Sequence, residues 1–448
     1  MENRNEVLFE KMPIPRAFRI LCLPVILGMV VNLLYNMVDT YFIGRLGDAA
    51  QMAAVSLCSP VFIILMGLGN IFGIGGSSVV SRLMGEKKHE DVRRASAMCF
   101  WIGILCGFLV GGVILLCMKP FTSLLGASEN TAGYTAEYLW VIVSASPLIL
   151  LAFTLMNILR CDGAAKESMV GSVLGAVVNM ALDPLLILAL HMGVRGAAIA
   201  TVAGYAAQDV LYCVYVLKKS AALSLSPKLA RPDSALLLGV FAIGLPASVT
   251  NVLSSISTIC MNNLLLSYGD SAIAAMGIAV KVTNIVTLIG VGFAAGLPPI
   301  IGYNYGAGDL TRLREVLKRA FLYAFVICAA LSVPVFLLAR PILRMFMDGA
   351  DIVEPGAQML RAMLLCGPFL GLQFVVTNYF QATGKALPAM LLSLCRQGIV
   401  FLICLYGMRA LLGWNGIVYA QTAADYLTLL ICAGLFTRFA LPELRSPS

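Results

Sequence analysis

Charged residues are scarce in this chain of 448 residues: Asp, Glu, Lys and Arg make up 12%, whereas apolar residues make up 60%. Soluble domains are about half apolar and about one quarter charged. The only two histidines, His89 and His191, form no HExxH motif, and no GxxxxGK[ST] phosphate loop occurs. The composition therefore excludes an ordinary soluble fold. The missing motifs exclude a zincin hydrolase and ATP hydrolysis within this chain, and we expect no enzyme.

Cysteine pairs of the CxxC type are also absent, although the chain has 13 cysteines. Most of them lie in apolar segments, as Cys58, Cys260 and Cys404 do. Cysteines in such surroundings behave as small buried hydrophobic residues. We expect neither disulfides nor a cysteine-based metal site, and no cofactor.

Long apolar runs fill most of the chain, whose mean hydropathy is +0.91. About 20 apolar residues in a helix cross a hydrocarbon core of ~30 Å. The sequence therefore predicts an all-α polytopic membrane protein. Twelve windows satisfy this requirement: 20–43, 52–78, 96–118, 134–159, 167–190, 196–217, 236–266, 272–300, 318–339, 357–381, 387–410 and 415–438.

Basic residues give the expected orientation, because Lys and Arg resist translocation. Most of the 31 fall in the two termini and the even-numbered loops, so both termini are predicted to be cytoplasmic. The net charge of +8 is thus an orientation signal and not a nucleic-acid footprint. The segment 1–19 lacks the features of a cleavable signal peptide. We expect a multi-pass protein of the cell (inner or plasma) membrane.

The chain repeats itself at an offset of 221 to 222 residues. Pro24 aligns with Pro246 and Pro147 with Pro368, and the loop 157–169 aligns with 378–390. Six helices per copy is an even number, so both copies enter the membrane in the same direction. Parallel repeats of this kind form transporters that bind substrate between their halves.

The repeat predicts how the chain is divided. The expected segments are a cytoplasmic N-terminus 1–19, a six-helix lobe 20–217, a cytoplasmic linker 218–234, a second six-helix lobe 235–439 and a cytoplasmic C-terminus 440–448.

Two aspartates in the first half are candidates for ion coupling. Asn32, Asn36 and Asp39 share one helical face, and Asn179 and Asp183 are an i, i+4 pair beside Pro184. A carboxyl inside the membrane is costly and needs a function. Oxygen groups of this kind suit a proton or a sodium ion, and the sequence suggests no other metal. The alternative is that Asp39 and Asp183 hold helices together by hydrogen bonds.

Further polar residues are expected to face a cavity or to pair with each other. Thr201, Tyr205 and Gln208 form a stripe in the sixth window, and the seventh window carries an uncharged stripe. Arg396 and Asp425 are predicted to form a structural ion pair. The expected cavity or substrate residues are Asn32, Asn36, Tyr138, Asn157, Thr201, Tyr205, Asn251, Thr258 and Lys281, where Lys281 either faces the cavity or reaches outward.

Several strings resemble the multidrug and toxic compound extrusion (MATE) family, in its bacterial multidrug export branch. They are LPVILGMVVNLLYNMVDTYFIGRLG, SPVFIILMGLGNIFGIGGSSVVSRLMGEKK, VVNMALDPLLI and SLCRQGIVF, and the resemblance covers about residues 17–440. It implies two lobes in a V around a central cavity, which export bulky, often cationic drugs in exchange for H+ or Na+.

The resemblance also implies roles for particular residues. Asp39, Asn179 and Asp183 match the family's first-lobe ion site, and Tyr138 and Thr201 match residues associated with it. Some relatives hold sodium with acids in helices 7 and 10, which this chain lacks.

The alternative within transport is a lipid-linked sugar flippase, which favours a basic cavity, whereas only Lys281 and Arg396 are basic within the predicted bundle. An intramembrane enzyme or receptor is disfavoured, because no catalytic pair and no large extramembrane domain occur. The expected partners are drugs or toxic organic cations and the lipid bilayer. A monomer without nucleic acid is expected, and the choice between proton and sodium stays open.

Overall fold

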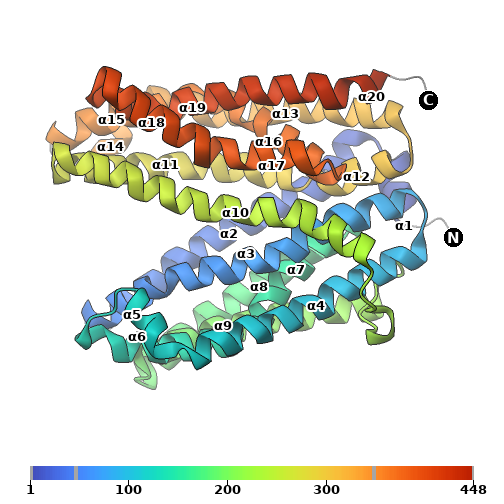
Figure 1. Ribbon diagram of the computed structural model, residues 1–448, viewed down its shortest axis with the longest axis horizontal. Coiled ribbons are helices and arrows are strands. Elements are labelled where there is room, and N and C mark those ends of the chain that lie inside the picture. The colour runs from blue at the N-terminus through green and yellow to red at the C-terminus, as the bar shows by residue number, and fades with distance from the viewer. Residues whose placement is uncertain (1–3, 45–48, 346–349, 446–448) are drawn as a thin grey trace. The chain divides into compact units, whose positions relative to one another are not determined.

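The computed structural model describes residues 4–44, 49–345 and 350–445, and every regular element in these ranges is a helix (Figure 1). Two compact units share the chain. One consists mainly of Leu27–Ser248, and the other consists mainly of Glu6–Ile26 and Val249–Ser448. The lobe boundaries expected from the sequence, 20–217 and 235–439, stay a prediction.

The first part of the chain contains the following helices. They are α1 (Arg4–Glu6), η1 (Val7–Lys11), α2 (Ile14–Gly44), α3 (Ala49–Gly85), α4 (His89–Leu116), α5 (Met118–Leu124), α6 (Glu129–Ser144), α7 (Ser146–Cys161), α8 (Ala165–Asp183), η2 (Pro184–Ala189), α9 (Gly193–Lys218) and η3 (Pro227–Leu229).

The second part continues with a similar series. It contains α10 (Ser234–Leu265), η4 (Leu266–Tyr268), α11 (Asp270–Ala295), α12 (Pro298–Gly306), α13 (Leu310–Leu337), α14 (Ala339–Arg344), α15 (Ala350–Leu365), α16 (Gly367–Ala382), α17 (Ala386–Leu394), η5 (Cys395–Ile399), α18 (Val400–Leu412), α19 (Trp414–Leu435), η6 (Phe436–Ala440) and α20 (Leu441–Arg445).

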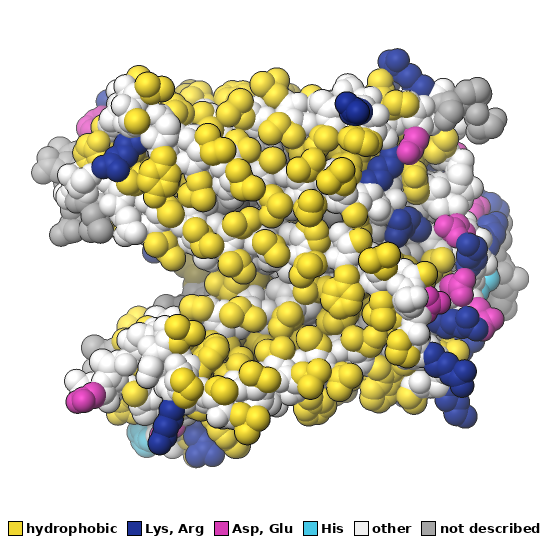
Figure 2. Space-filling model, viewed as in Figure 1, with side chains coloured by type: hydrophobic (Ala, Val, Ile, Leu, Met, Phe, Trp, Pro, Cys, Tyr) yellow, Lys and Arg dark blue, Asp and Glu magenta, His cyan; other side chains and the backbone are white. Residues whose placement is uncertain are grey.

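Within the described ranges, nine helices are long and apolar enough to cross a membrane, and two bent pairs raise the number to as many as eleven. The eleventh expected window, 387–410, is divided. α17 and α18 meet at η5, where Gly398 has φ −125° and ψ −111°, outside the helical region, and neither piece reaches the length of a span. Figure 2 shows apolar side chains covering much of the visible surface, as a lipid-facing protein requires.

The repeat is visible in the backbone. Both bent pairs break just before an aligned proline: α6 and α7 bend by 53° ahead of Pro147, and the corresponding pair α15 and α16 bends by 45° ahead of Pro368. The loops that follow α7 and α16 each contain a glycine with positive φ, 67° at Gly163 and 75° at Gly384. Only glycine adopts this conformation without steric cost, so the two loops keep the same geometry.

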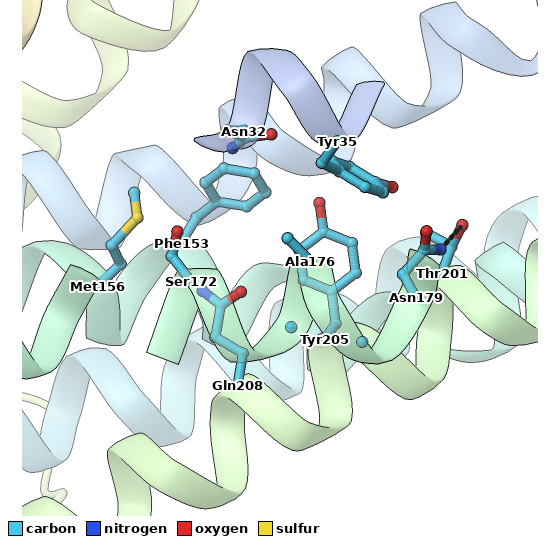
Figure 3. A pocket seen from close by; sticks show the side chains of 12 residues that line it. Asn32, Tyr35, Phe153, Met156, Ser172, Ala176, Asn179, Thr201, Tyr205 and Gln208 are labelled. Carbon is cyan, nitrogen blue, oxygen red and sulfur yellow. Dashed lines mark hydrogen bonds between the residues drawn. The ribbon is translucent and has the colours of Figure 1, made fainter. Parts of the chain in front are cut away.

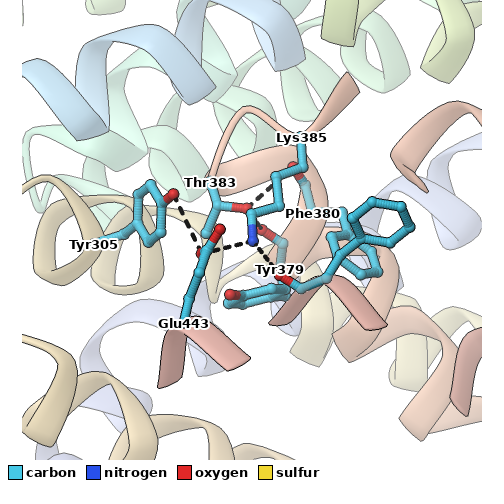
Figure 4. Close-up of polar contacts among 7 residues, drawn as sticks. Tyr305, Tyr379, Phe380, Thr383, Lys385 and Glu443 are labelled. Atoms are coloured by element: carbon cyan, nitrogen blue, oxygen red, sulfur yellow. Dashed lines mark hydrogen bonds and ion pairs between the residues drawn. The ribbon is translucent and has the colours of Figure 1, made fainter. Parts of the chain in front are cut away.

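The two aligned loops are fixed by different contacts. In the first, Asp162 accepts hydrogen bonds from Asn5 Nδ2 at 2.9 Å and from the Tyr215 hydroxyl at 3.2 Å. In the second, Lys385 pairs with Glu443 Oε2 at 2.6 Å and also donates to the carbonyl of Phe439 (Figure 4). The backbone turn is therefore repeated, while its side-chain anchors are not.

Close helix contacts in the first unit depend on glycine. A Cβ atom on Gly175 of α8 would lie 2.8 Å from the carbonyl oxygen of Gly204 in α9, and a Cβ atom on Gly107 of α4 would lie 2.5 Å from Pro147 Cα. Small residues at these positions let the helix backbones approach closely. The contact between Gly175 and Gly204 places the polar face of α8 against that of α9.

Candidate functional site

The polar face of α2 begins the candidate site. Asn36 Nδ2 donates to the backbone carbonyl of Asn32 at 2.8 Å, so the two side chains stack along one face as their spacing predicts. Asp39 lies one turn farther along and is half-buried, and its buried Oδ1 has no hydrogen-bond partner in the part of the chain that the structure describes. The end of α2 thus presents a carboxyl group to the interior of the first unit.

The last turn of α8 provides a second carboxyl group. Asn179 is 2% exposed and Asp183 is 0% exposed. Asn179 Nδ2 donates to Thr201 Oγ1 of α9 at 3.3 Å, which leaves the buried Asn179 Oδ1 without a partner. Neither carboxylate oxygen of Asp183 has a hydrogen-bond partner among the residues that the structure describes. The end of α8 therefore carries three buried acceptor oxygens. One is Oδ1 of Asn179, and the other two are the carboxylate oxygens of Asp183, one helical turn farther along.

Asp39 of α2 and Asp183 of α8 lie close enough for their carboxyl groups to interact. Three hydroxyl groups surround them: Tyr35, Tyr138 and Tyr205 all lie within electrostatic range of Asp39. Two ionised carboxylates in such a site repel each other, and burial penalises each charge. A proton or a small cation shared by the site would remove both costs.

Two cavities of the first unit adjoin this cluster. The smaller, about 40 Å³, is enclosed by α2, α7, α8 and α9 (Figure 3). Its polar lining includes Asn32, Tyr35, Asn179, Thr201, Tyr205 and Gln208. A buried water occupies roughly 10–15 Å³ measured in this way, so the space fits a few waters or a small ion and excludes a drug.

The larger cavity of the first unit measures about 310 Å³. Asn36, Asp39, Tyr138 and Thr201 contribute to its wall, and no Lys or Arg of the described part of the chain lines either cavity. Asp39 is therefore the carboxyl that the larger cavity reaches directly. Asp183 lines neither cavity, is fully buried and interacts with Asp39.

Four of the predicted cavity residues lie elsewhere. Asn157 donates to the carbonyl of Phe153 at 2.9 Å and lines neither cavity of the first unit. Asn251, Thr258 and Lys281 belong to the second unit, where Thr258 lines a separate cavity and Lys281 is exposed outside that cavity's lining. The structure thus does not group these four with the acidic cluster.

Arg396 and Asp425 also lie in the second unit. Arg396 Nε donates to Asp425 Oδ1 at 3.1 Å, and Gln421 Nε2 donates to the same oxygen at 3.0 Å. Asp425 is 1% exposed. This carboxylate has a basic partner, whereas the described residues include none for Asp39 or Asp183.

Sequence reasoning missed Tyr35, which lies within electrostatic range of Asp39, and Asp209, which lies within electrostatic range of Tyr205. Tyr35 lines both cavities of the first unit and occupies the face of α2 between Asn32 and Asp39. Asp209 of α9 is 4% exposed and neither of its carboxylate oxygens has a partner among the described residues. Asp209 is an ionisable residue inside the apolar window 196–217, which by itself marks a functional candidate.

The sequence profile of the MatE family matches residues 24–185 and matches again over residues 246–406. The chain belongs to the MatE family. The acidic cluster Asp39, Asn179 and Asp183 lies entirely within the first matched segment, and the two segments begin 222 residues apart, as the internal repeat predicts.

Curated relatives of this MatE-family chain are named multidrug export protein MepA. The protein from Staphylococcus aureus is 33% identical over 430 residues and that from Staphylococcus saprophyticus is 31% identical; each alignment covers 96% of this chain and 95% of the relative. A solved MATE structure in complex with MaD3S has a TM-score of 0.90 at 22% identity, with 99% of both chains covered. An outward-facing multidrug resistance MATE transporter of the MOP superfamily has a TM-score of 0.88 at 23% identity, covering 100% of this chain and 99% of its own. The two structures share the fold.

Proposed function

We propose that this protein exports bulky amphipathic compounds, organic cations among them, by alternating access in exchange for a proton or a sodium ion. The observation that carries the proposal is the pair of neighbouring carboxyl groups, Asp39 and Asp183, beside cavities in which the described residues include no Lys or Arg. The relatives named as multidrug export proteins support the same substrate class. Membership of the MatE family favours transport over the enzyme alternative, and the relatives' names favour multidrug export over the flippase alternative.

Each residue of the cluster has a distinct role in this mechanism. Asp39 faces the larger cavity and receives the ion first, and Asp183 shares it from the buried side. Thr201 accepts the amide hydrogen of Asn179, so the amide oxygen of Asn179 stays available as a third oxygen ligand. Oxygen ligands of this type bind hard cations such as sodium, and the carboxyl groups also bind a proton.

Ion binding changes which conformation is stable. With both carboxylates charged and unpaired, an arrangement that hydrates the cluster is favoured, whereas neutralisation permits a dry, closed arrangement. A ligand shifts a conformational equilibrium only by its differential affinity for the two states, and this cluster provides such a difference. Substrate and ion thereby bind alternately.

The membrane potential provides enough free energy for this exchange. One elementary charge that crosses about 100 mV releases ~2.3 kcal/mol. That free energy corresponds to a concentration ratio of roughly 50 for a tightly coupled neutral solute. Export therefore needs no ATP site.

Efflux from proteoliposomes tests the proposal. Ethidium is loaded into vesicles that contain the purified protein, and either a pH gradient or a sodium gradient is imposed, with potassium replacing sodium in the matched sample. We expect efflux to follow one of the two gradients, and to be lost in Asp39→Asn and in Asp183→Asn. Glu129→Gln, an exposed acid at the start of α6, is the control. Unchanged efflux in both aspartate variants would refute the site.

The membrane orientation is part of the same proposal. We infer that both termini are cytoplasmic and that the protein works as a monomer. A protease-cleavable tag at either terminus should be removed in inside-out vesicles and protected in intact cells. Protection of either tag in inside-out vesicles would contradict this orientation.

A further inference from the structure

A cavity of about 200 Å³ lies wholly within the second unit, whereas the acidic cluster belongs to the first. Its polar lining comes largely from α10 and α11 and includes Thr258, Asn262, Thr283 and Asn284. Its apolar lining includes three methionines, Met261, Met276 and Met363. Methionine side chains adapt to differently shaped apolar ligands. The cavity therefore has the composition of a binding site for an amphipathic molecule.

Among the described residues that line this cavity, only Arg396 and Asp425 carry charged side chains. Their exposures differ: the Arg396 side chain is 16% exposed and the Asp425 side chain is 2% exposed. Asp425 Oδ1 accepts two hydrogen bonds, one from Arg396 Nε and one from Gln421 Nε2. The pair therefore presents its cationic member to the cavity.

Arg396 retains unused hydrogen-bonding capacity. Over the described part of the chain, its guanidinium forms a hydrogen bond only through Nε, and its plane lies over Phe374 with Cζ 5.0 Å from the ring centroid. Neither terminal nitrogen of Arg396 is both buried and unpartnered in the described part of the chain, so both retain accessible surface, and Arg396 lines the cavity. A guanidinium held by a carboxylate on one edge and by a ring on one face is oriented in advance for a ligand.

The backbone explains how Arg396 reaches this position. It lies in η5, where the helix is interrupted at Gly398. A Cβ atom on Gly398 would lie 2.9 Å from Leu253 Cδ1, so the interruption is packed directly against α10. A regular helix through 387–410 would not turn the chain at this point.

We propose that the cavity of the second unit binds the carboxylate group of an amphipathic organic anion or zwitterion, with Arg396 as the anchoring residue and the methionines around the apolar body. A carboxylate accepts two parallel hydrogen bonds from a guanidinium, which is the geometry that the two terminal nitrogens offer. As a statement about exported cargo, this inference rests on the proposed function and extends the substrate range beyond cations. The inference that the cavity binds a carboxylate does not depend on the proposed function.

The test compares two ligands that differ only in charge, 2-naphthoate and 2-naphthamide. Their equilibrium binding to the full-length protein in detergent is measured by dialysis, with protein-free micelles as the blank. Charge-assisted hydrogen bonds to arginine predict that the wild-type protein prefers the carboxylate by roughly tenfold or more. Equal affinity of the two ligands for the wild-type protein overturns the inference.

A charge-neutral double variant separates recognition from folding. In Arg396→Gln combined with Asp425→Asn, no buried charge is left without a partner. We expect the preference for the carboxylate to disappear while the amide still binds, which shows that the cavity is intact. The control Lys281→Gln removes an exposed basic residue outside the lining and should keep the preference. A double variant that still prefers the carboxylate would disprove the role of Arg396.

Failure of this inference is distinguishable from failure of the proposed function, because binding in detergent requires no gradient. Absence of gradient-driven ethidium efflux from the wild-type protein would refute the export mechanism and leave the naphthoate preference standing. Absence of that preference would refute the carboxylate site and leave ion-coupled ethidium efflux standing.

Discussion

The two copies of the repeat treat their buried acids in opposite ways. In the first, Asp39 and Asp183 lie next to each other without a basic partner among the described residues; in the second, Asp425 is paired with Arg396. At the repeat offset, Asp39 corresponds to Met261 and Asp183 to Cys404, so the second copy has apolar residues where the first has acids. A buried carboxyl without a partner can gain free energy from an incoming ion, whereas a paired one cannot. The comparison supports the proposal that ion coupling belongs to the first copy.

The largest effect is expected from removal of the unpaired acids. Asp183→Asn should abolish gradient-driven ethidium efflux, because the carboxyl that shares the ion is lost. The same variant should keep or raise the thermal unfolding midpoint in detergent, since a buried charge without a protein partner is removed. Efflux assays and thermal unfolding on one preparation measure both results.

Opposite signs for function and stability make this prediction specific. If Asp183 served only to hold helices together, Asp183→Asn would lower the unfolding midpoint along with transport. The exposed acid variant Glu129→Gln should change neither quantity.

In the second copy, a change that leaves the buried acid Asp425 without its basic partner should lower the stability of the protein. Arg396→Met leaves Asp425 charged at 1% exposure, and an uncompensated buried charge costs about 3–5 kcal/mol. Replacing the whole pair, Arg396→Met with Asp425→Leu, should restore most of the lost stability. Thermal or denaturant unfolding of the three proteins measures the effect. A single variant as stable as the double variant would show that the pair contributes nothing to stability.

Close packing of α8 against α9 in the first copy predicts a smaller effect. Gly175→Ala places a methyl group 2.8 Å from the Gly204 carbonyl, and overpacking of this kind costs about 1–3 kcal/mol. Gly112→Ala in α4 is the matched control, because nothing lies within 4 Å of the methyl group that it adds, and it should gain up to about 1 kcal/mol from helix propensity. Equal unfolding midpoints for the two variants would contradict the close contact of α8 with α9.

Local features of the fold could be predicted from the sequence, because they depend on neighbours in the chain. The aligned prolines Pro147 and Pro368 do mark equivalent bends, and Asn179 and Asp183 do share a helical face. The break at Gly398 was not predicted, since it depends on packing against Leu253, which lies far away in sequence.

The candidate site could be predicted in part. Each acid stands out as a charge in an apolar run, but the contact between Asp39 and Asp183 is tertiary, and no spacing rule gives it. Tyr35 was missed because a tyrosine in an apolar helix carries no distinctive signal. Asp209 was missed although its charge inside the window 196–217 did carry one.

The smallest expected effect concerns helix caps at aligned positions. Asp309 begins α13 and accepts a hydrogen bond from the Arg312 backbone amide at 2.9 Å, whereas Lys88, at the corresponding position before α4, forms no side-chain cap. Asp309→Ala should therefore cost about 1 kcal/mol, and Lys88→Asp should gain a similar or smaller amount. An acid also interacts favourably with the positive end of the helix dipole, which a lysine opposes. Asp309→Ala should lower the unfolding midpoint and Lys88→Asp should raise it. If both variants shift the midpoint in the same direction, the predicted difference between the two caps is wrong.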